Sequence, residues 1–115
     1  MTDSAAHLRV IEETPAYWRV VFDNPPLNIV DAGIFEGLQG VLARMDASSS
    51  LRVVVFESAN PEFYLAHYDL TDTSGSLIKT VGPSGLPVLT DTFVRLTKSP
   101  VASIAKIRGR VRGVG

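Results

Sequence analysis

The run Val53-Val54-Val55-Phe56 constrains the fold of this chain more than any other segment. Four consecutive β-branched or aromatic residues are typical of a strand that is buried on both faces, because no polar side chain alternates with them to meet water. We therefore predict a strand from Arg52 to Glu57 inside the core of the fold. The segments on either side of it indicate the fold class.

A β-hairpin and a helix are predicted before this strand. The segments Leu8 to Glu13 and Tyr17 to Phe22 have strand character, and Thr14-Pro15-Ala16 between them is typical of a turn. Asp31 is suited to cap a helix that runs to about Asp46. That helix carries apolar residues at helical spacing: Ile34, Phe35, Leu38, Val41, Leu42 and Met45. Hairpin, helix and buried strand in this order indicate an α/β layer structure.

The second half of the chain continues the alternation of helix and strand. Residues Asp69 to Pro83 are rich in Ser, Thr and Gly and predict a surface loop with a short helical turn. A further helix ending at Lys98-Ser99-Pro100 is predicted from apolar residues at helical spacing: Leu86, Leu89, Phe93 and Leu96. Val101 to Ile107 is a strand candidate. The chain closes on Gly113-Val114-Gly115, and glycine-rich turns usually lead into a helix, so we expect a longer domain.

Composition excludes several classes of protein. The chain has no cysteine, which excludes disulfides, thiolate metal sites and a cysteine nucleophile. Its net charge of −1 creates no general attraction to nucleic acid or to an anionic membrane. No segment approaches the ~20 apolar residues of a membrane helix, and the first residues lack the features of a secretory signal. We expect a cytoplasmic protein that contacts neither membrane nor nucleic acid.

Few side chains form a pattern that indicates chemistry by itself. His7 and His67 do not belong to a spaced ligand cluster, so no metal site is predicted. Asp69 and Asp72 are more typical of loop caps than of an acid/base pair. A basic row has period two: Lys106, Arg108, Arg110 and Arg112. It could contact phosphate or nucleic acid, but we favour a solvated edge or a row of ion pairs, with one arginine able to meet a pyrophosphate.

Four segments in order resemble the crotonase family, that is, the enoyl-CoA hydratases and isomerases. Asn24-Pro25-Pro26-Leu27-Asn28 resembles the family's NRP…LNAL segment, and Leu51 to Ser58 resembles its VRVVVLTG strand. Glu62 to Leu70 is similar to AFSAGADL, and Gly109 to Gly115 resembles GYALGGG. Each motif alone is weak, but their order and approximate spacing cover nearly the whole chain.

The resemblance implies a crotonase-like (ClpP/crotonase) spiral of ββα units, and enzymes that act on acyl-CoA thioesters. Two backbone N–H groups would hold the thioester oxygen as it becomes an enolate, and the matching positions here are Tyr68 and Val114. The register at Val114 could slip by one. The residues implied to line the coenzyme A path are Leu27, Ala66, His67, Asp69 and Leu70. Coenzyme A would enter only as part of the substrate, without a separate cofactor.

The resemblance also implies that residues 1–115 are the N-terminal part of a crotonase-like domain. The family's acid/base carboxylates lie beyond the glycine-rich turn, so we expect the chain to be inactive alone. The implied whole protein is a homo-oligomer, a trimer or hexamer. The alternative is a non-catalytic acyl-CoA binding or protein-interaction module of the same fold, indicated by His67 and Tyr68 in place of the family's glycine and alanine. Acyl chain and exact reaction stay open.

Overall fold

The computed structural model describes residues 2–5, 7–113 and 115, with the side chains of 7–113 and 115. Its elements in chain order are β1 (Thr2–Ala5), β2 (Leu8–Thr14), β3 (Tyr17–Phe22), α1 (Ala32–Ala47), β4 (Val53–Ser58), β5 (Phe63–Leu65), α2 (Ser76–Lys79), α3 (Val88–Lys98), β6 (Ala102–Ala105) and β7 (Arg110–Val111). A five-stranded sheet has the order β1-β2-β3-β4-β6, and β5 pairs with β7 in a second sheet. This is the predicted mixture of helix and sheet.

The predicted hairpin is present as strands β2 and β3. They pair antiparallel with Val10 opposite Val20, so apolar side chains at period two fall on one buried face. Strand β1, which the sequence analysis did not predict, pairs antiparallel with the outer edge of β2. Beyond β3 the sheet becomes parallel: β4 pairs with β3 and β6 pairs with β4.

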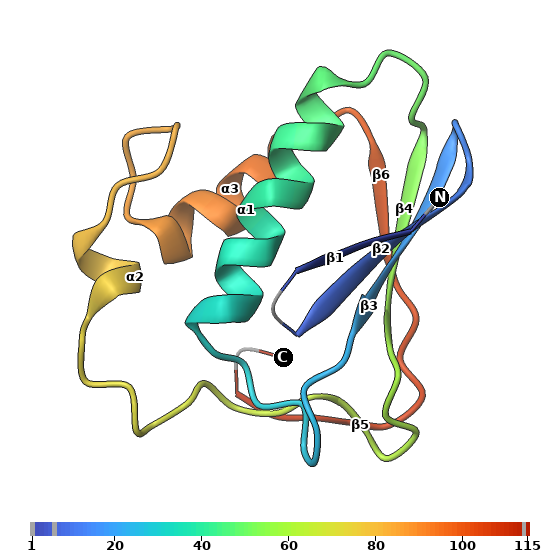
Figure 1. The fold of residues 1–115 in the computed structure, drawn as a ribbon. Coiled ribbons are helices and arrows are strands. Elements are labelled where there is room, and N and C mark those ends of the chain that lie inside the picture. Colours follow the sequence, from blue (N-terminus) through green and yellow to red (C-terminus); the bar gives the residue numbers. More distant parts are fainter. Residues whose placement is uncertain (1, 6, 114) are drawn as a thin grey trace.

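Helices α1 and α3 connect the parallel strands and lie together on one side of the sheet, as Figure 1 shows. Asp31 caps α1 as predicted, because its Oδ1 accepts a hydrogen bond of 2.9 Å from the Ile34 N–H. Within α1, Gly37 faces Leu8 of the sheet so closely that a Cβ there would lie 2.5 Å from the Leu8 Cδ2 atom. The glycine therefore permits close packing of helix on sheet.

The prediction that β4 is buried on both faces is wrong. Val54 and Phe56 are buried beneath the helices, whereas Val53 and Val55 on the other face are half-buried. The helices cover one face of the sheet only. A continuous apolar run therefore did not mean that both faces of this strand are covered by other elements. On the uncovered face Arg19 donates hydrogen bonds to Glu13 and Glu57, and these carboxylates, Glu57 above all, raise the pKa of Arg19.

Helix α3 differs from its predicted apolar stripe. Leu89 and Leu96 pack against the core, but the Phe93 side chain is 45 % exposed. The fully buried residues of the helix are instead Asp91 and Thr92. The side-chain amide of Gln39 in α1 donates hydrogen bonds of 2.8 Å to the Asp91 Oδ2 atom and to the Thr92 Oγ1 atom. A buried polar contact therefore joins the two helices, beside the edge-to-face contact of Phe35 with Phe93, whose ring centres lie 5.8 Å apart.

Candidate functional site

The segment from Phe63 to Asp69 forms a ledge between two other parts of the chain. On one side, the loop after β3 contacts it through the N–H of Ala66, which donates to the Asn28 carbonyl at 2.9 Å. On the other side, the N–H of Arg112 donates to the Leu65 carbonyl at 3.1 Å. The structure thus brings together three of the four segments that carry the family resemblance.

The direction of the Tyr68 N–H follows from its peptide plane. The Val30 N–H donates to the His67 carbonyl at 3.1 Å, and the Asp69 N–H donates to the Val30 carbonyl at 2.7 Å. In a trans peptide the C=O and the following N–H point in opposite directions. Because the His67 carbonyl points toward Val30, the Tyr68 N–H points away from it, toward the side where Arg112 and the glycine-rich turn pair with the ledge.

Within the described residues no acceptor is present for the Tyr68 N–H. Elsewhere on the ledge the N–H groups of Ala66 and Asp69 have backbone acceptors, whereas the N–H of His67, like that of Tyr68, has none among the described residues. Most backbone N–H groups of a folded protein are paired, so a donor with no acceptor in the protein is available to a ligand. The arrangement suits an oxygen atom of a ligand.

The predicted second donor, the N–H of Val114, lies outside the described residues. The residues beside it place the turn against the ledge, because a Cβ added to Gly113 would lie 3.1 Å from the His67 Cα atom. Gly113 has φ of 56°, a value that favours glycine. The N–H of Gly115 donates to the Arg112 carbonyl at 3.0 Å, so it is not free to serve as the donor in place of Val114.

The Tyr68 side chain is half-buried and packs against the core. Its hydroxyl donates to the Asp72 Oδ2 atom at 2.6 Å. Burial, assisted by that hydrogen bond, raises the pKa of Tyr68 to about 12. The phenol is therefore neutral across the physiological range.

Asp69 and Asp72 cap turns of the following loop, as the sequence predicted. Asp69 Oδ1 accepts from the N–H and the hydroxyl of Thr71, and Asp72 Oδ1 accepts from the N–H and the hydroxyl of Ser74. These hydrogen bonds lower the pKa of Asp69, and those from Tyr68 and Ser74 lower the pKa of Asp72. Both carboxylates are ionised and engaged in local structure.

The remaining predicted substrate residues have different surroundings. His67 is exposed, with its Nδ1 atom 2.7 Å from the Tyr68 carbonyl oxygen, while Ala66 is buried. Leu27 and Leu70 are 40 % and 82 % exposed. A cavity of about 220 Å³ brings Leu27 and Asp69 together; its lining is Asn24, Pro25, Pro26, Leu27, Ile29, Asp31 and Asp69.

Sequence reasoning missed the structural role of Asn28. This residue is 1 % exposed and has φ of 55°. Its amide donates to the Ser58 Oγ atom and at 3.0 Å to the Tyr64 carbonyl, and its Oδ1 accepts from the Asn24 N–H at 2.8 Å. Asn28 thereby joins the loop after β3 to the end of β4 and to β5. An asparagine directly after Pro25-Pro26-Leu27 was the available signal, since asparagine tolerates positive φ.

The basic row does not form one continuous face. Lys106 pairs with Glu57 at 4.0 Å, and Arg108 donates to the Ser58 carbonyl at 3.0 Å. The Arg110 guanidinium lies 5.5 Å from the centre of the Phe63 ring. Arg112 is exposed. This placement agrees with the solvated edge that the sequence favoured, with one ion pair at its start.

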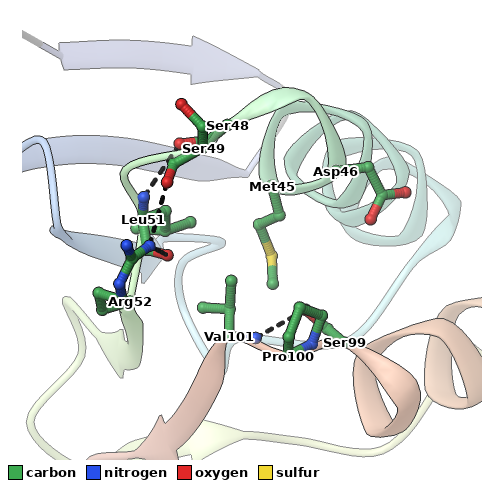
Figure 2. A pocket seen from close by; sticks show the side chains of 9 residues that line it. All are labelled: Met45, Asp46, Ser48, Ser49, Leu51, Arg52, Ser99, Pro100 and Val101. Atoms are coloured by element: carbon green, nitrogen blue, oxygen red, sulfur yellow. Dashed lines mark hydrogen bonds between the residues drawn. The ribbon is translucent and has the colours of Figure 1, made fainter.

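A larger cavity, of about 480 Å³, lies at the amino ends of β4 and β6, at the opposite end of these strands from the ledge (Figure 2). Its lining comes from the end of α1 and the segments that lead into β4 and β6: Met45, Asp46, Ser48, Ser49, Leu51, Arg52, Ser99, Pro100 and Val101. Several polar groups drawn there bond to one another, as Leu51 N–H does to the Ser48 hydroxyl at 3.1 Å, while the Asp46 carboxylate pairs with Arg95. The ledge lies at the carboxyl ends of the strands, where ligands of α/β sheets bind.

Two other kinds of site are not found in the described part of the chain. No group of three or more histidine or acidic residues there could hold a metal ion. No helix among the described residues has both the length and the apolar character to cross a bilayer.

Comparison with solved structures identifies the fold. A candidate enoyl-CoA hydratase from Streptomyces avermitilis matches with a TM-score of 0.75 and 31 % sequence identity, over 90 % of this chain and 39 % of that chain. The enoyl-CoA hydratase from Bacillus anthracis matches with a TM-score of 0.71 at 19 % identity, over 90 % and 40 % of the two chains. This is the crotonase fold.

An enoyl-CoA hydratase/isomerase from Marinobacter aquaeolei shares the crotonase fold, with a TM-score of 0.69 and 16 % identity over 87 % of this chain and 40 % of that chain. The resemblance seen in the four segments is thus confirmed by structure. The chain spans about 40 % of the length of these crotonase-fold structures. No model of a protein family matches the sequence, and no curated protein matches it.

Proposed function

We propose that the chain supplies one backbone donor of an oxyanion hole in an acyl-CoA thioester site of the enoyl-CoA hydratase/isomerase type. The observation that carries the proposal is the Tyr68 N–H, which has no acceptor among the described residues and points to the side of the glycine-rich turn. The expected second donor is the N–H of Val114.

A fixed backbone donor suits enolate chemistry. When a proton leaves the carbon beside a thioester, negative charge develops on the thioester oxygen. A donor already held in place stabilises that charge without having to reorganise during the reaction. The hydrogen bonds of Val30 with His67 and Asp69 hold the peptide planes on both sides of residue 68 along one edge, which fixes the side to which the donor points before substrate arrives.

The substrate-binding part of the proposal uses the cavity beside the ledge. Leu27 and Asp69 line this space of about 220 Å³. Ala66, His67 and Leu70 lie within three residues of Asp69 in the sequence. We assign coenzyme A to this side because the cavity contains Leu27 and Asp69, two of the positions that the family resemblance implies for the coenzyme A path. Coenzyme A is part of the substrate here, and no separate cofactor is proposed.

A second candidate function is acyl-CoA binding without catalysis. It is favoured by the state of the two acids nearest to Tyr68. Asp69 and Asp72 have lowered pKa values and accept hydrogen bonds from their own loop. A carboxylate that is committed in this way is a poor proton carrier. Binding of a thioester without turnover would therefore match the residues described here.

Calorimetric titration of the chain with acetoacetyl-CoA tests the proposal, with free acetoacetate as control. We expect saturable binding of the thioester. Tyr68→Pro should abolish it, because proline has no N–H, while the matched variant Tyr68→Ala keeps the N–H and should still bind the thioester saturably, although more weakly than the native chain. Equal binding by both variants would refute a role for this donor.

The broader proposals concern the whole protein. They are a lyase or isomerase of fatty acid metabolism, a cytoplasmic location, and assembly as a homo-trimer or hexamer. They are supported by the crotonase fold shared with enoyl-CoA hydratase/isomerase structures. Sedimentation of the protein over a range of concentrations would test the assembly.

A further inference from the structure

The side chain of the proposed donor residue is anchored at both ends. The Tyr68 ring packs against the core, and its hydroxyl reaches four residues along the chain to the Asp72 Oδ2 atom at 2.6 Å. The carboxylate is ionised at neutral pH, and hydrogen bonds to charged acceptors are stronger than those between neutral groups. The resemblance segment AFSAGADL has alanine at this position, so the backbone donor itself does not require such an anchor.

Asp72 is held independently of Tyr68. Its Oδ1 atom accepts from the Ser74 N–H at 3.0 Å and from the Ser74 hydroxyl at 2.7 Å. Its own N–H donates to the Asp69 carbonyl at 3.2 Å. The carboxylate is therefore a fixed acceptor, and the Tyr68 hydroxyl meets it without having to order it first.

The backbone on either side of Tyr68 is fixed on one edge only. The contacts with Val30 restrain the peptide planes before and after residue 68, but the edge that carries the free N–H has no partner among the described residues. A plane bonded along one edge can still tilt about that edge. The anchored side chain supplies the missing restraint, because it limits rotation of the residue about its N–Cα bond.

We propose that the Tyr68 hydroxyl and Asp72 form a positioning pair that holds the Tyr68 N–H in line with a developing enolate oxygen. This inference rests on the proposed function. Neither side chain exchanges protons with the substrate in it. Both act by keeping the backbone donor in the geometry that an oxyanion requires, where small errors in position cost much of the effect.

The test separates binding of the thioester from stabilisation of its enolate. Butyryl-CoA reports ground-state affinity by calorimetry, and acetoacetyl-CoA reports enolate formation through the ultraviolet absorbance of the bound enolate. The variants are Tyr68→Phe and Asp72→Asn, alone and combined. Tyr17→Phe is the matched control, because Tyr17 is the first residue of β3, at the opposite end of that strand from the loop that contacts the ledge, and loses the same hydroxyl group.

We expect each single variant to lower the enolate fraction about tenfold, the scale of one charge-assisted hydrogen bond, with butyryl-CoA affinity within about twofold. The double variant should match the single ones, since the two groups form one contact. Asp72→Asn is a near-isosteric change that leaves the Tyr68 ring in place. An enolate absorbance equal to that of the native chain in this variant would overturn the proposed positioning pair, even if Tyr68→Phe failed to fold. Absence of thioester binding by the native chain would instead overturn the proposed function, and the inference with it.

Discussion

Gly37 of α1 lies against Leu8 of β2, so that a Cβ atom at Gly37 would be 2.5 Å from the Leu8 Cδ2 atom. Leu8 is 2 % exposed and belongs to the core. Alanine at position 37 would gain helix propensity worth about 1 kcal/mol but would overpack the interface by about 1–3 kcal/mol. We expect Gly37→Ala to lower the free energy of unfolding by about 1–2 kcal/mol in urea titrations.

The matched control in the same helix is Gly40, where an added Cβ would have no neighbour within 4 Å. Gly40→Ala should raise the free energy of unfolding by up to about 1 kcal/mol. Opposite signs for the two variants would confirm that helix packing, rather than helix propensity, decides at Gly37. Stabilisation by both would contradict the packing described here.

Asn28 should be among the most sensitive polar positions. Asn28→Ala leaves the Tyr64 carbonyl and the Asn24 N–H without their partner, and it places alanine at positive φ. We expect a loss of about 2–4 kcal/mol in urea unfolding, from buried unsatisfied groups and backbone strain together. Asn28→Gly removes the same hydrogen bonds but accepts the φ angle. It should therefore be less damaging than alanine, and equal losses would show that backbone strain contributes nothing.

Acid should weaken the contact between α1 and α3. Burial by itself would raise the pKa of Asp91, but hydrogen bonds from Ser84, Gln39 and Arg95 outweigh burial and lower that pKa to about 2. A carboxyl whose pKa is lower in the folded state contributes stability above its ordinary pKa of about 3.8, and this is lost as the pH falls toward 2. Thermal unfolding between pH 6 and 2 should show this loss, and Asp91→Asn should reduce its slope between pH 4 and 2.

The ion pairs on the uncovered face should matter little. Arg19 bonds to Glu57 and Glu13 across neighbouring strands, but its side chain is 32 % exposed. We expect Glu57→Gln to cost about 1 kcal/mol, because solvent reaches the pair from the side of Arg19 and screens it, although the Glu57 side chain is only 13 % exposed. The cost should shrink further in concentrated salt. A loss that is large and independent of salt would mean that this face is more shielded than the structure shows.

The parts of the fold that the sequence predicted well depend on local signals. Alternating apolar residues define Tyr17–Phe22, and a side-chain oxygen at Asp31 defines the start of α1. The strands β5 and β7 are short, and pairing with each other across 40 or more residues of chain defines them. A short window cannot contain that information.

Which face of a strand or helix is buried by other elements likewise depends on the whole fold. Val53 and Val55 have the same chemistry as Val54, yet only Val54 lies under the helices. Phe93 was expected inside and is 45 % exposed, because Asp91 and Thr92 occupy the buried side of α3. In the candidate site, the sequence resemblance pointed to Tyr68, but the direction of its N–H required the hydrogen bond between Val30 and His67.

The peptide plane between His67 and Tyr68 has a consequence for how such a site would change over generations. The proposed chemistry needs an amide hydrogen at residue 68, and it needs the N–H groups of Val30, Ala66 and Asp69 to hold the ledge. At each of these places proline alone is excluded on chemical grounds, since it alone lacks that hydrogen. We therefore expect related sequences to vary in side chain at these four positions while proline stays absent from them.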